Sequence, residues 1–231
     1  MIKVEGINQY YGQSHTLWDF SMEVMAGTCT ALIGRNGVGK TTLLKCVMGL
    51  LPVRSGSMRF DGADLLALPA ERRAALGIGY VPQGRMVFPL MTVEENLATG
   101  LGALAPARRR IPDLVWELFP VLADMLTRRG GDLSGGQQQQ LAIARALVLE
   151  PRFLILDEPT EGIQPNIVQQ IGDVIVRLNR ELGLTVLVVE QKLPFVRRVA
   201  DRFCIVTKGT VVAEGGMPQL SDGLVAEHLS V

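Results

Sequence analysis

The sequence contains few residues of the kinds that build metal or disulfide sites. Its two histidines, His15 and His228, are too few for a multi-histidine metal site, and we expect both to be surface or loop residues. Its three cysteines are Cys29, Cys46 and Cys204. They are odd in number and form no CxxC pair, so the sequence indicates neither a zinc site nor a disulfide framework.

The sequence also has no excess of positive or negative charge and no long apolar run. Lys plus Arg number 23 and Asp plus Glu number 23, which gives no support to a broad basic nucleic-acid-binding surface. No apolar run approaches the ~20 residues that cross a bilayer, and the segment 1–5 lacks the features of a secretory signal. We therefore expect a soluble cytoplasmic chain without a nucleic-acid partner.

The composition indicates a folded chain. Hydrophobic residues make up 48% and charged residues 20% of the 231 residues, which is enough to bury a sizeable core. At ~100–200 residues per domain, this length allows one large domain or two small ones.

Strand and helix patterns alternate at both ends of the sequence and the middle is mostly helical. The pattern predicts strands at 2–7, 20–24, 28–33, 57–60, 78–81, 153–156, 185–189, 202–207 and 210–214. It predicts helices at 41–50, 93–101, 114–126, 136–149, 165–182 and 194–200. We expect an α/β fold with antiparallel N-terminal strands, a sheet core and a helical insertion at roughly 84–130.

One motif predicts a phosphate site. The segment 34–41, GRNGVGKT, fits GxxxxGK[ST] between a predicted strand and a predicted helix. Its glycines allow backbone amides to form an anion cradle at the positive end of the helix. Lys40 can then contact the β- and γ-phosphates, and Thr41 can place its hydroxyl on Mg²⁺. The candidate nucleotide-binding residues here are Gly34, Asn36, Gly37, Gly39, Lys40, Thr41 and Thr42.

Two further segments have the composition of anion or cation sites. The apolar strand 153–156 ends in Asp157, which can hold Mg²⁺, and Glu158, which can orient or deprotonate an attacking water. Taken alone, the two acids could be solvated strand-end residues. Ser134 precedes Gly135 and Gly136 at a predicted helix start, which is a second anion site or a plain N-cap with a flexible turn.

Together, the phosphate loop, LSGGQ at 133–137 and LILDE at 154–158 resemble the nucleotide-binding subunit of an ABC transporter over essentially the whole chain. The resemblance implies a P-loop NTPase of the ABC ATPase class, with ATP and Mg²⁺ as ligands and ATP hydrolysis as its activity. It implies a single domain, 1–231, with a mixed-sheet catalytic core at 1–83 and 131–231, an N-terminal antiparallel β subdomain, and an inserted helical subdomain at 84–130.

The resemblance also assigns residues. Gln83 matches the glutamine that contacts Mg²⁺ and couples to membrane subunits, and Tyr11, next to Tyr10, matches the aromatic that stacks on adenine. Gln191 stands where the family has its switch histidine. Glutamine can hydrogen-bond a γ-phosphate but cannot take up a proton, which leaves Glu158 as the main base. The second departure is near Gln164, where the family usually has an aspartate.

The resemblance implies partners as well. Ser134, Gly135, Gly136 and Gln137 would close on ATP held by a second subunit, identical or different, arranged head to tail. Membrane permease subunits would dock at the helical insertion, for which 88–91 are candidates unless they are core residues. A solute-binding protein would be an indirect partner. The chain would then sit peripherally on the cytoplasmic face of the cell membrane.

The transported solute follows only from finer resemblance. Segments 85–89, 92–97 and 189–191 look like the branched-chain amino acid importer class. Within it, 8–15, 137–140 and 161–165 are most similar to a urea importer subunit, with a branched-chain amino acid importer as the alternative. A soluble ABC ATPase of translation or DNA repair is a further alternative, although such proteins usually resemble two fused copies or carry long coiled coils. LSGGQ and the lack of a guanine-specific NKxD speak against a P-loop kinase or GTPase.

Overall fold

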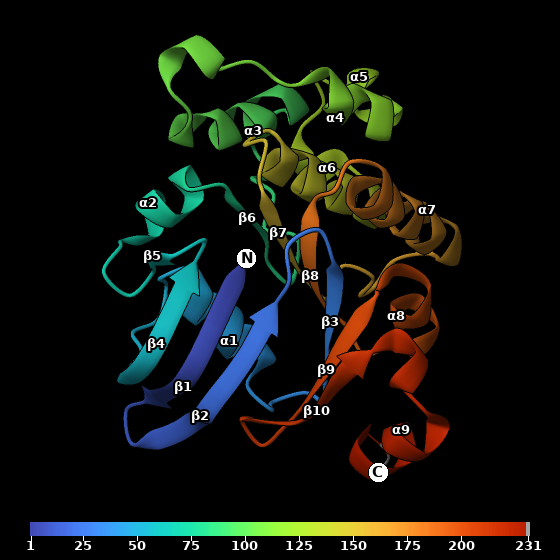
Figure 1. The fold of residues 1–231 in the computed structure, drawn as a ribbon. Helices are drawn as coiled ribbons and strands as arrows, with labels where there is room; N and C mark the ends of the chain where they lie inside the picture. The colour runs from blue at the N-terminus through green and yellow to red at the C-terminus, as the bar shows by residue number, and fades with distance from the viewer. Residues whose placement is uncertain (230–231) are drawn as a thin grey trace.

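The computed structural model describes residues 1–229 and contains two β-sheets with helices between and around them (Figure 1). The antiparallel sheet has the strand order β2 (Ser14–Val24), β1 (Ile2–Tyr11), β4 (Ser55–Phe60) and β5 (Ala63–Asp64). The larger sheet has the order β10 (Thr210–Gly216), β9 (Arg202–Thr207), β3 (Cys29–Ile33), β8 (Thr185–Val189), β7 (Phe153–Asp157) and β6 (Ile78–Val81). Its strands run parallel from β9 to β6, and β10 pairs antiparallel with β9. This arrangement confirms the expected α/β fold.

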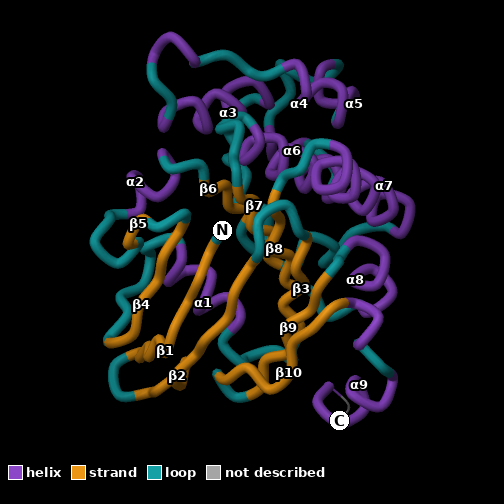
Figure 2. The backbone as a smooth tube through the Cα atoms, viewed as in Figure 1, coloured by secondary structure: helices purple, strands orange, loops and turns teal. Residues whose placement is uncertain are grey.

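The helices cover both faces of the larger sheet (Figure 2). They are α1 (Lys40–Val47), α2 (Ala70–Ala75), α3 (Val93–Gly100), α4 (Asp113–Leu118), α5 (Pro120–Ala123), α6 (Gly135–Leu147), α7 (Pro165–Val176), α8 (Leu193–Val199) and α9 (Asp222–Leu229). The segment 93–123 forms the green helical layer that contains α3, α4 and α5 in Figure 1. Within residues 1–229, no helix has both the length and the apolar character needed to span a membrane.

The strands of the larger sheet are apolar because both of their faces are buried. In β7, Phe153 and Ile155 join the core that holds α1 and the antiparallel sheet, while Leu154 and Leu156 join the core under α6 and α7. All five residues of β7 are buried. A strand covered on both sides reads as a continuous apolar run, which is why 153–156 and 185–189 were predictable as buried strands.

Two predicted helices are interrupted. The helix expected over 114–126 is wrong: α4 ends at Leu118, and Phe119 leaves helical geometry with φ −134° because Pro120 follows it and starts α5. The helix expected over 165–182 is α-helical only to Val176 and continues as a π-helix over Arg177–Glu181. The elements α2, α9 and β5 were not anticipated from the sequence.

The two histidines lie in a strand and a helix rather than in loops. His15 lies within β2 and is half-buried, with its ring stacked on Tyr10 at a centroid distance of 4.0 Å. The cysteines are all free and buried. Burial raises the pKa of each thiol to about 12, so none is a ready nucleophile or metal ligand.

A buried arginine holds the end of α1. Arg73, from α2, is 5% exposed and donates from Nη1 to the carbonyls of Cys46 and Val47 at 2.6 and 2.8 Å, and from Nε to Leu68 at 2.9 Å. A positive charge at a helix C-terminus is stabilising because the last carbonyls point toward it. Arg73 therefore fixes the far end of the helix that carries Lys40.

We expect Arg73→Ala to lower the free energy of unfolding by about 2–4 kcal/mol, because the carbonyls of Val47 and Leu68 lose their side-chain donor. Urea denaturation followed by circular dichroism measures this. Arg72→Ala, on the exposed side of the same helix, is the matched control and should change stability by less than ~0.5 kcal/mol. Equal effects from the two variants would contradict the capping role.

Candidate nucleotide-binding site

The glycine-rich loop lies between the end of β3 and the start of α1, at the carboxyl edge of the parallel strands. Gly39 has φ +105°, and a Cβ there would approach Leu17 Cδ2 to 2.8 Å. A Cβ at Gly34 would lie 2.5 Å from the carbonyl oxygen of Val206 in β9. Both positions therefore require glycine. The motif lies between a strand and a helix, as its sequence pattern predicts.

Lys40 projects its charge into this loop. Its side chain is 5% exposed, and Nζ donates to the carbonyls of Gly34 and Arg35 at 2.7 and 2.8 Å. Glu158 Oε1 lies 3.8 Å from the same nitrogen. Burial lowers the pKa of Lys40, and the carboxylates of Glu158 and Asp157 counter part of that shift. Apart from these contacts, the buried Lys40 ammonium group in this loop has little solvation.

Two acids end β7 in different environments. Asp157 is 1% exposed, and neither of its carboxylate oxygens has a partner with full hydrogen-bond geometry among the described residues. Burial raises the pKa of Asp157 to about 6, and the neighbouring Thr41 hydroxyl offsets part of that rise. Glu158 adopts φ +48°, a rare conformation for a glutamate, which turns its carboxylate away from the strand.

The Glu158 carboxylate receives two amides. Gln83 Nε2 donates to Glu158 Oε2 at 3.2 Å and to Glu161 Oε2 at 3.0 Å. Gln191 Nε2 donates to Glu158 Oε1 at 2.8 Å and to Asn36 Oδ1 at 2.6 Å. Gln83 and Gln191, predicted from separate segments, therefore meet at the same carboxylate beside the phosphate loop.

These residues border one cavity of about 240 Å³. Its lining residues are Asn36, Gly37, Gly39, Lys40, Thr41, Thr42, Gln83 and Glu158. At its edge the Tyr11 hydroxyl lies 3.5 Å from Thr42 Oγ1, and Tyr11 is 46% exposed. Tyr10 already stacks on His15, which leaves Tyr11 as the better candidate for contact with a base.

The LSGGQ segment lies elsewhere. Ser134, Gly135, Gly136 and Gln137 line a second cavity, of about 460 Å³, that shares no lining residue with the first. Ser134 is the N-cap of α6: its Oγ accepts from the Gln137 amide at 3.3 Å, and the Ser134 amide donates to Gln137 Oε1 at 2.9 Å. The N-cap alternative is therefore present, and both polar side chains serve their own helix in this chain.

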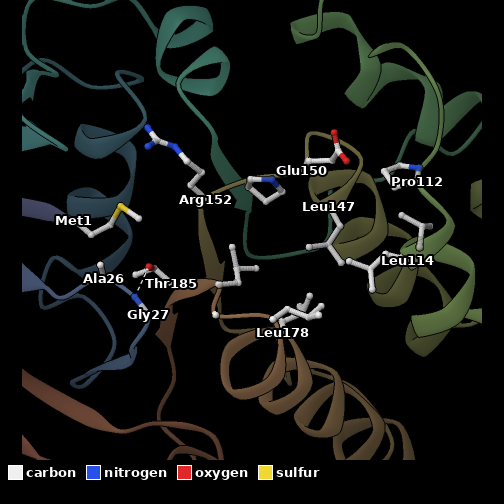
Figure 3. Close-up of a pocket in the computed structure, with 15 residues that line it drawn as sticks. Met1, Ala26, Gly27, Pro112, Leu114, Leu147, Glu150, Arg152, Leu178 and Thr185 are labelled. Carbon is white, nitrogen blue, oxygen red and sulfur yellow. Dashed lines mark hydrogen bonds between the residues drawn. The ribbon is translucent and has the colours of Figure 1, made fainter.

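A third cavity, of about 440 Å³, lies at the opposite edge of the sheet (Figure 3). Arg152 and Thr185, at the amino ends of β7 and β8, line it together with apolar side chains such as Leu114, Leu147 and Leu178. It contains none of the candidate residues. Ligands of open parallel sheets bind at the carboxyl ends of the strands, so the loop that contains Lys40 is the candidate site.

Sequence reasoning missed Glu190. Its carboxylate is 3% exposed and accepts the amide and the hydroxyl of Thr160 and the amides of Gln191 and Lys192, the last two at 2.8 and 3.1 Å. It joins the segment that follows Glu158 to the segment that carries Gln191. An acid placed directly after the buried strand 185–189 was the available signal.

Comparison with known proteins defines the class. The sequence model of the family described as ABC transporter matches residues 17–161. The high-affinity branched-chain amino acid transport ATP-binding protein BraG of Pseudomonas aeruginosa is 43% identical over 213 residues, which cover 92% of this chain and 91% of BraG. The probable branched-chain amino acid transport ATP-binding protein LivF of Archaeoglobus fulgidus is 36% identical over 95% of this chain and 94% of LivF.

Solved structures agree. A nucleotide-free ATP-binding cassette from an ABC transporter has a TM-score of 0.85 at 27% identity and matches 100% of this chain and 95% of that one. A dimeric cassette in a post-hydrolysis state, bound to ADP and Pi, has a TM-score of 0.83 at 26% identity, with 94% and 99% coverage. The chain belongs to the ABC transporter family. It has the P-loop NTPase fold of the ABC ATPases and is an ATPase of that family.

We expect Glu190 and Thr160 to be energetically coupled, because the buried carboxylate depends on the Thr160 donors. In a double-mutant cycle with Glu190→Gln and Thr160→Val, the interaction should be about 1–3 kcal/mol in the free energy of unfolding. Glu71→Gln, an exposed acid, is the control and should show no coupling with Thr160→Val. Strictly additive losses for Glu190→Gln and Thr160→Val would show that the link has no energetic weight.

Proposed function

We propose that this chain binds and hydrolyses ATP between two ATP-binding subunits and thereby powers solute import through membrane permease subunits. The observation that carries the proposal is the separation of its two anion-binding edges. The Lys40 cavity and the Ser134 cavity share no lining residue, which supports their contacting two different nucleotides. A second subunit, identical or different and placed head to tail, supplies the missing half.

On the Lys40 side, the roles follow from chemistry. The loop amides and Lys40 bind the β- and γ-phosphates, and Tyr11 stacks on the adenine. Glu158 is the general base, because it is the acid that lines the cavity and borders its cation. Gln191 aligns Glu158 with Asn36 of the phosphate loop and can donate to a γ-phosphate, but it cannot exchange a proton as a histidine does.

A divalent cation fits the edge beside Asp157. Among residues 1–229, neither oxygen of its buried carboxylate has a partner with full hydrogen-bond geometry, and hard oxygen donors are those that Mg²⁺ prefers. Thr41 would supply a hydroxyl and Gln83 an amide oxygen. Within residues 1–229 no three His, Cys, Asp or Glu side chains gather into a metal site, so phosphate oxygens and water would complete the set. When bound, Mg²⁺ neutralises charge on the phosphates.

On the Ser134 side, the start of α6 faces the partner's nucleotide. Gly135 and Gly136 begin a helix whose first amides have no intrahelical acceptor. Their N–H groups, together with Ser134 and Gln137, form the part that closes on the γ-phosphate of the neighbouring subunit. The dimeric ADP- and Pi-bound cassette similar to this chain supports such a pairing.

The segment 84–130 is the helical subdomain in this proposal, with 1–83 and 131–231 as the catalytic core. The permease docking surface in this proposal is the loop of the helical subdomain that contains Met86, Phe88 and Leu90. These apolar side chains are 65%, 47% and 80% exposed. Asn96 is fully buried and bonds to the amide and carbonyl of Phe88 and to further loop carbonyls, which keeps this loop in one conformation. The chain thus lies peripherally on the cytoplasmic membrane face.

The solute class we propose is branched-chain amino acids. The names of BraG and LivF, 43% and 36% identical to this chain, support it. The urea expectation rests on short sequence segments, and the names of these relatives do not support it. The solute itself is recognised by permease and binding-protein subunits, so no residue of this chain decides between the two.

We expect Glu158→Gln to lower the kcat of ATP hydrolysis at least ~100-fold, because the base is lost, while ATP binding is retained and an ATP-bound dimer accumulates. Gln191→Ala should lower kcat by only about tenfold, the effect of one lost positioning hydrogen bond. Phosphate release and gel filtration with ATP measure both.

Lys40→Ala should weaken ATP binding itself, and Gln169→Ala, on the exposed side of α7, is the inert control. A Glu158→Gln protein that turns over normally, or a Gln191→Ala protein with the larger loss, would contradict these roles.

Reconstitution separates the two solutes. With its permease and solute-binding protein in proteoliposomes, this chain should drive uptake of radiolabelled leucine upon addition of ATP, and the Glu158→Gln variant should not. Uptake of labelled urea in place of leucine would overturn the solute assignment and leave the ATPase assignment intact. Co-purification with ribosomes or DNA in place of permeases would overturn the transport function.

A further inference from the structure

Three consecutive residues after Gln83 are left-handed. Gly84, Arg85 and Met86 have φ values of +77°, +68° and +47°. Only the first is glycine, so Arg85 and Met86 are in a backbone conformation that is unfavourable unless neighbouring residues stabilise it. Arg145 of α6 stabilises this turn, because its Nη2 donates to the carbonyls of Met86 at 2.8 Å and Arg85 at 3.4 Å.

This turn directs the Arg85 guanidinium into a junction of three segments. Nη1 donates to Gln138 Oε1 in the first turn of α6 at 3.3 Å. Nη2 donates to the carbonyls of Glu161 and Gly162 at 3.4 and 3.3 Å. A Cβ at Gly135 would lie 2.9 Å from Nη1, so the guanidinium packs directly on the start of α6. Among residues 1–229 no carboxylate forms an ion pair with Arg85.

The junction connects two cavities that share no lining residue. Glu158 accepts from Gln83, and Gln83 donates to the side chain of Glu161. The carbonyl of Glu161 accepts from Arg85, whose other nitrogen reaches α6 beside Gly135. A continuous set of polar contacts therefore runs from the Lys40 cavity to the helix start that lines the Ser134 cavity.

The Arg85 guanidinium lies beside the start of α6, where a nearby anion would be favourable. A cation beside a helix N-terminus is unfavourable because the first amides are themselves positive. No carboxylate among the described residues forms an ion pair with Arg85, so the guanidinium adds to the positive potential at Gly135. An anion that approaches the start of α6 relieves this repulsion, which ties the position of Arg85 to the presence of a phosphate there.

We propose that Arg85 is a positioning residue that couples the two half-sites of one chain: it holds the start of α6 in register with the loop that follows Glu158. Nucleotide at the chain's own phosphate loop then sets the position from which Gly135 meets the nucleotide of its partner. This inference rests on the proposed two-subunit site.

The planar fork of arginine explains the choice of residue. One guanidinium reaches Gln138 through Nη1 and the Glu161 and Gly162 carbonyls through Nη2. Lysine keeps the charge but offers a single nitrogen, so Arg85→Lys separates geometry from charge. Arg108→Lys, at an exposed arginine paired with Glu150, is the matched control.

The test uses full-length chain in the Glu158→Gln background. Affinity for a fluorescent ATP analogue is measured at protein concentrations that keep the chain monomeric, and ATP-driven dimerisation is measured by analytical ultracentrifugation. We expect Arg85→Lys to leave nucleotide affinity within twofold and to weaken dimerisation at least tenfold. With Glu158 restored, kcat should fall at least tenfold and KM for ATP should stay within threefold. Arg108→Lys should match its parent throughout.

Two results overturn the inference alone: dimerisation and kcat of Arg85→Lys equal to the parent, or loss of monomer nucleotide affinity in step with a lowered Tm, which marks a merely structural role. Failure of the Glu158→Gln parent itself to dimerise with ATP overturns the proposed function and this inference with it. A dimerising parent with a defective Arg85→Lys variant supports both.

Discussion

The Glu158 carboxylate is the contact on which the arrangement of the site depends. Lys40 approaches it from the phosphate loop at 3.8 Å, Gln83 from the segment after β6 at 3.2 Å, and Gln191 from the segment after β8 at 2.8 Å. Three segments far apart in the chain thus share one acceptor. Because Glu158 adopts a left-handed conformation at the end of the strand, the fully buried Asp157 and the partly buried Glu158 can be adjacent in sequence and still have different chemistry.

Burial on both faces explains why this edge was predictable. The strands β3, β7 and β8 are covered by α1 on one side and by α6 and α7 on the other, so their sequences are short apolar runs. Each run ends where polar residues begin, and parallel strands bring those ends to one edge. The phosphate loop after β3 and the acids at the end of β7 follow from that rule without knowledge of any side-chain contact, whereas Gln191 after β8 was identified through its resemblance to the family.

Contacts between distant segments were not predictable in this way. Arg85 reads as one cation in a mixed segment, yet its acceptors lie 53 to 77 residues away. The glycines of LSGGQ were interpreted as a source of exposed amides. In the structure a Cβ at Gly135 would lie 2.9 Å from Arg85, and one at Gly136 would lie 3.0 Å from Ile167, so close packing also favours glycine at both positions. The helix break before Pro120 could be predicted from the proline itself. The π-helix after Val176 has no local sequence signal that we recognise.

The separation of the two cavities determines how hydrolysis would act in the proposed complex. A ligand shifts an equilibrium only by the difference in its affinity for the two states. Nucleotide held by the Lys40 side alone binds an isolated chain and a paired chain equally, so it favours neither. Contacts made by the start of α6 exist only in the pair, and in the proposed geometry they are directed at the γ-phosphate. Cleavage of that phosphate therefore removes the difference in nucleotide affinity between the paired and the isolated chain. The pair loosens although ADP still occupies the Lys40 cavity.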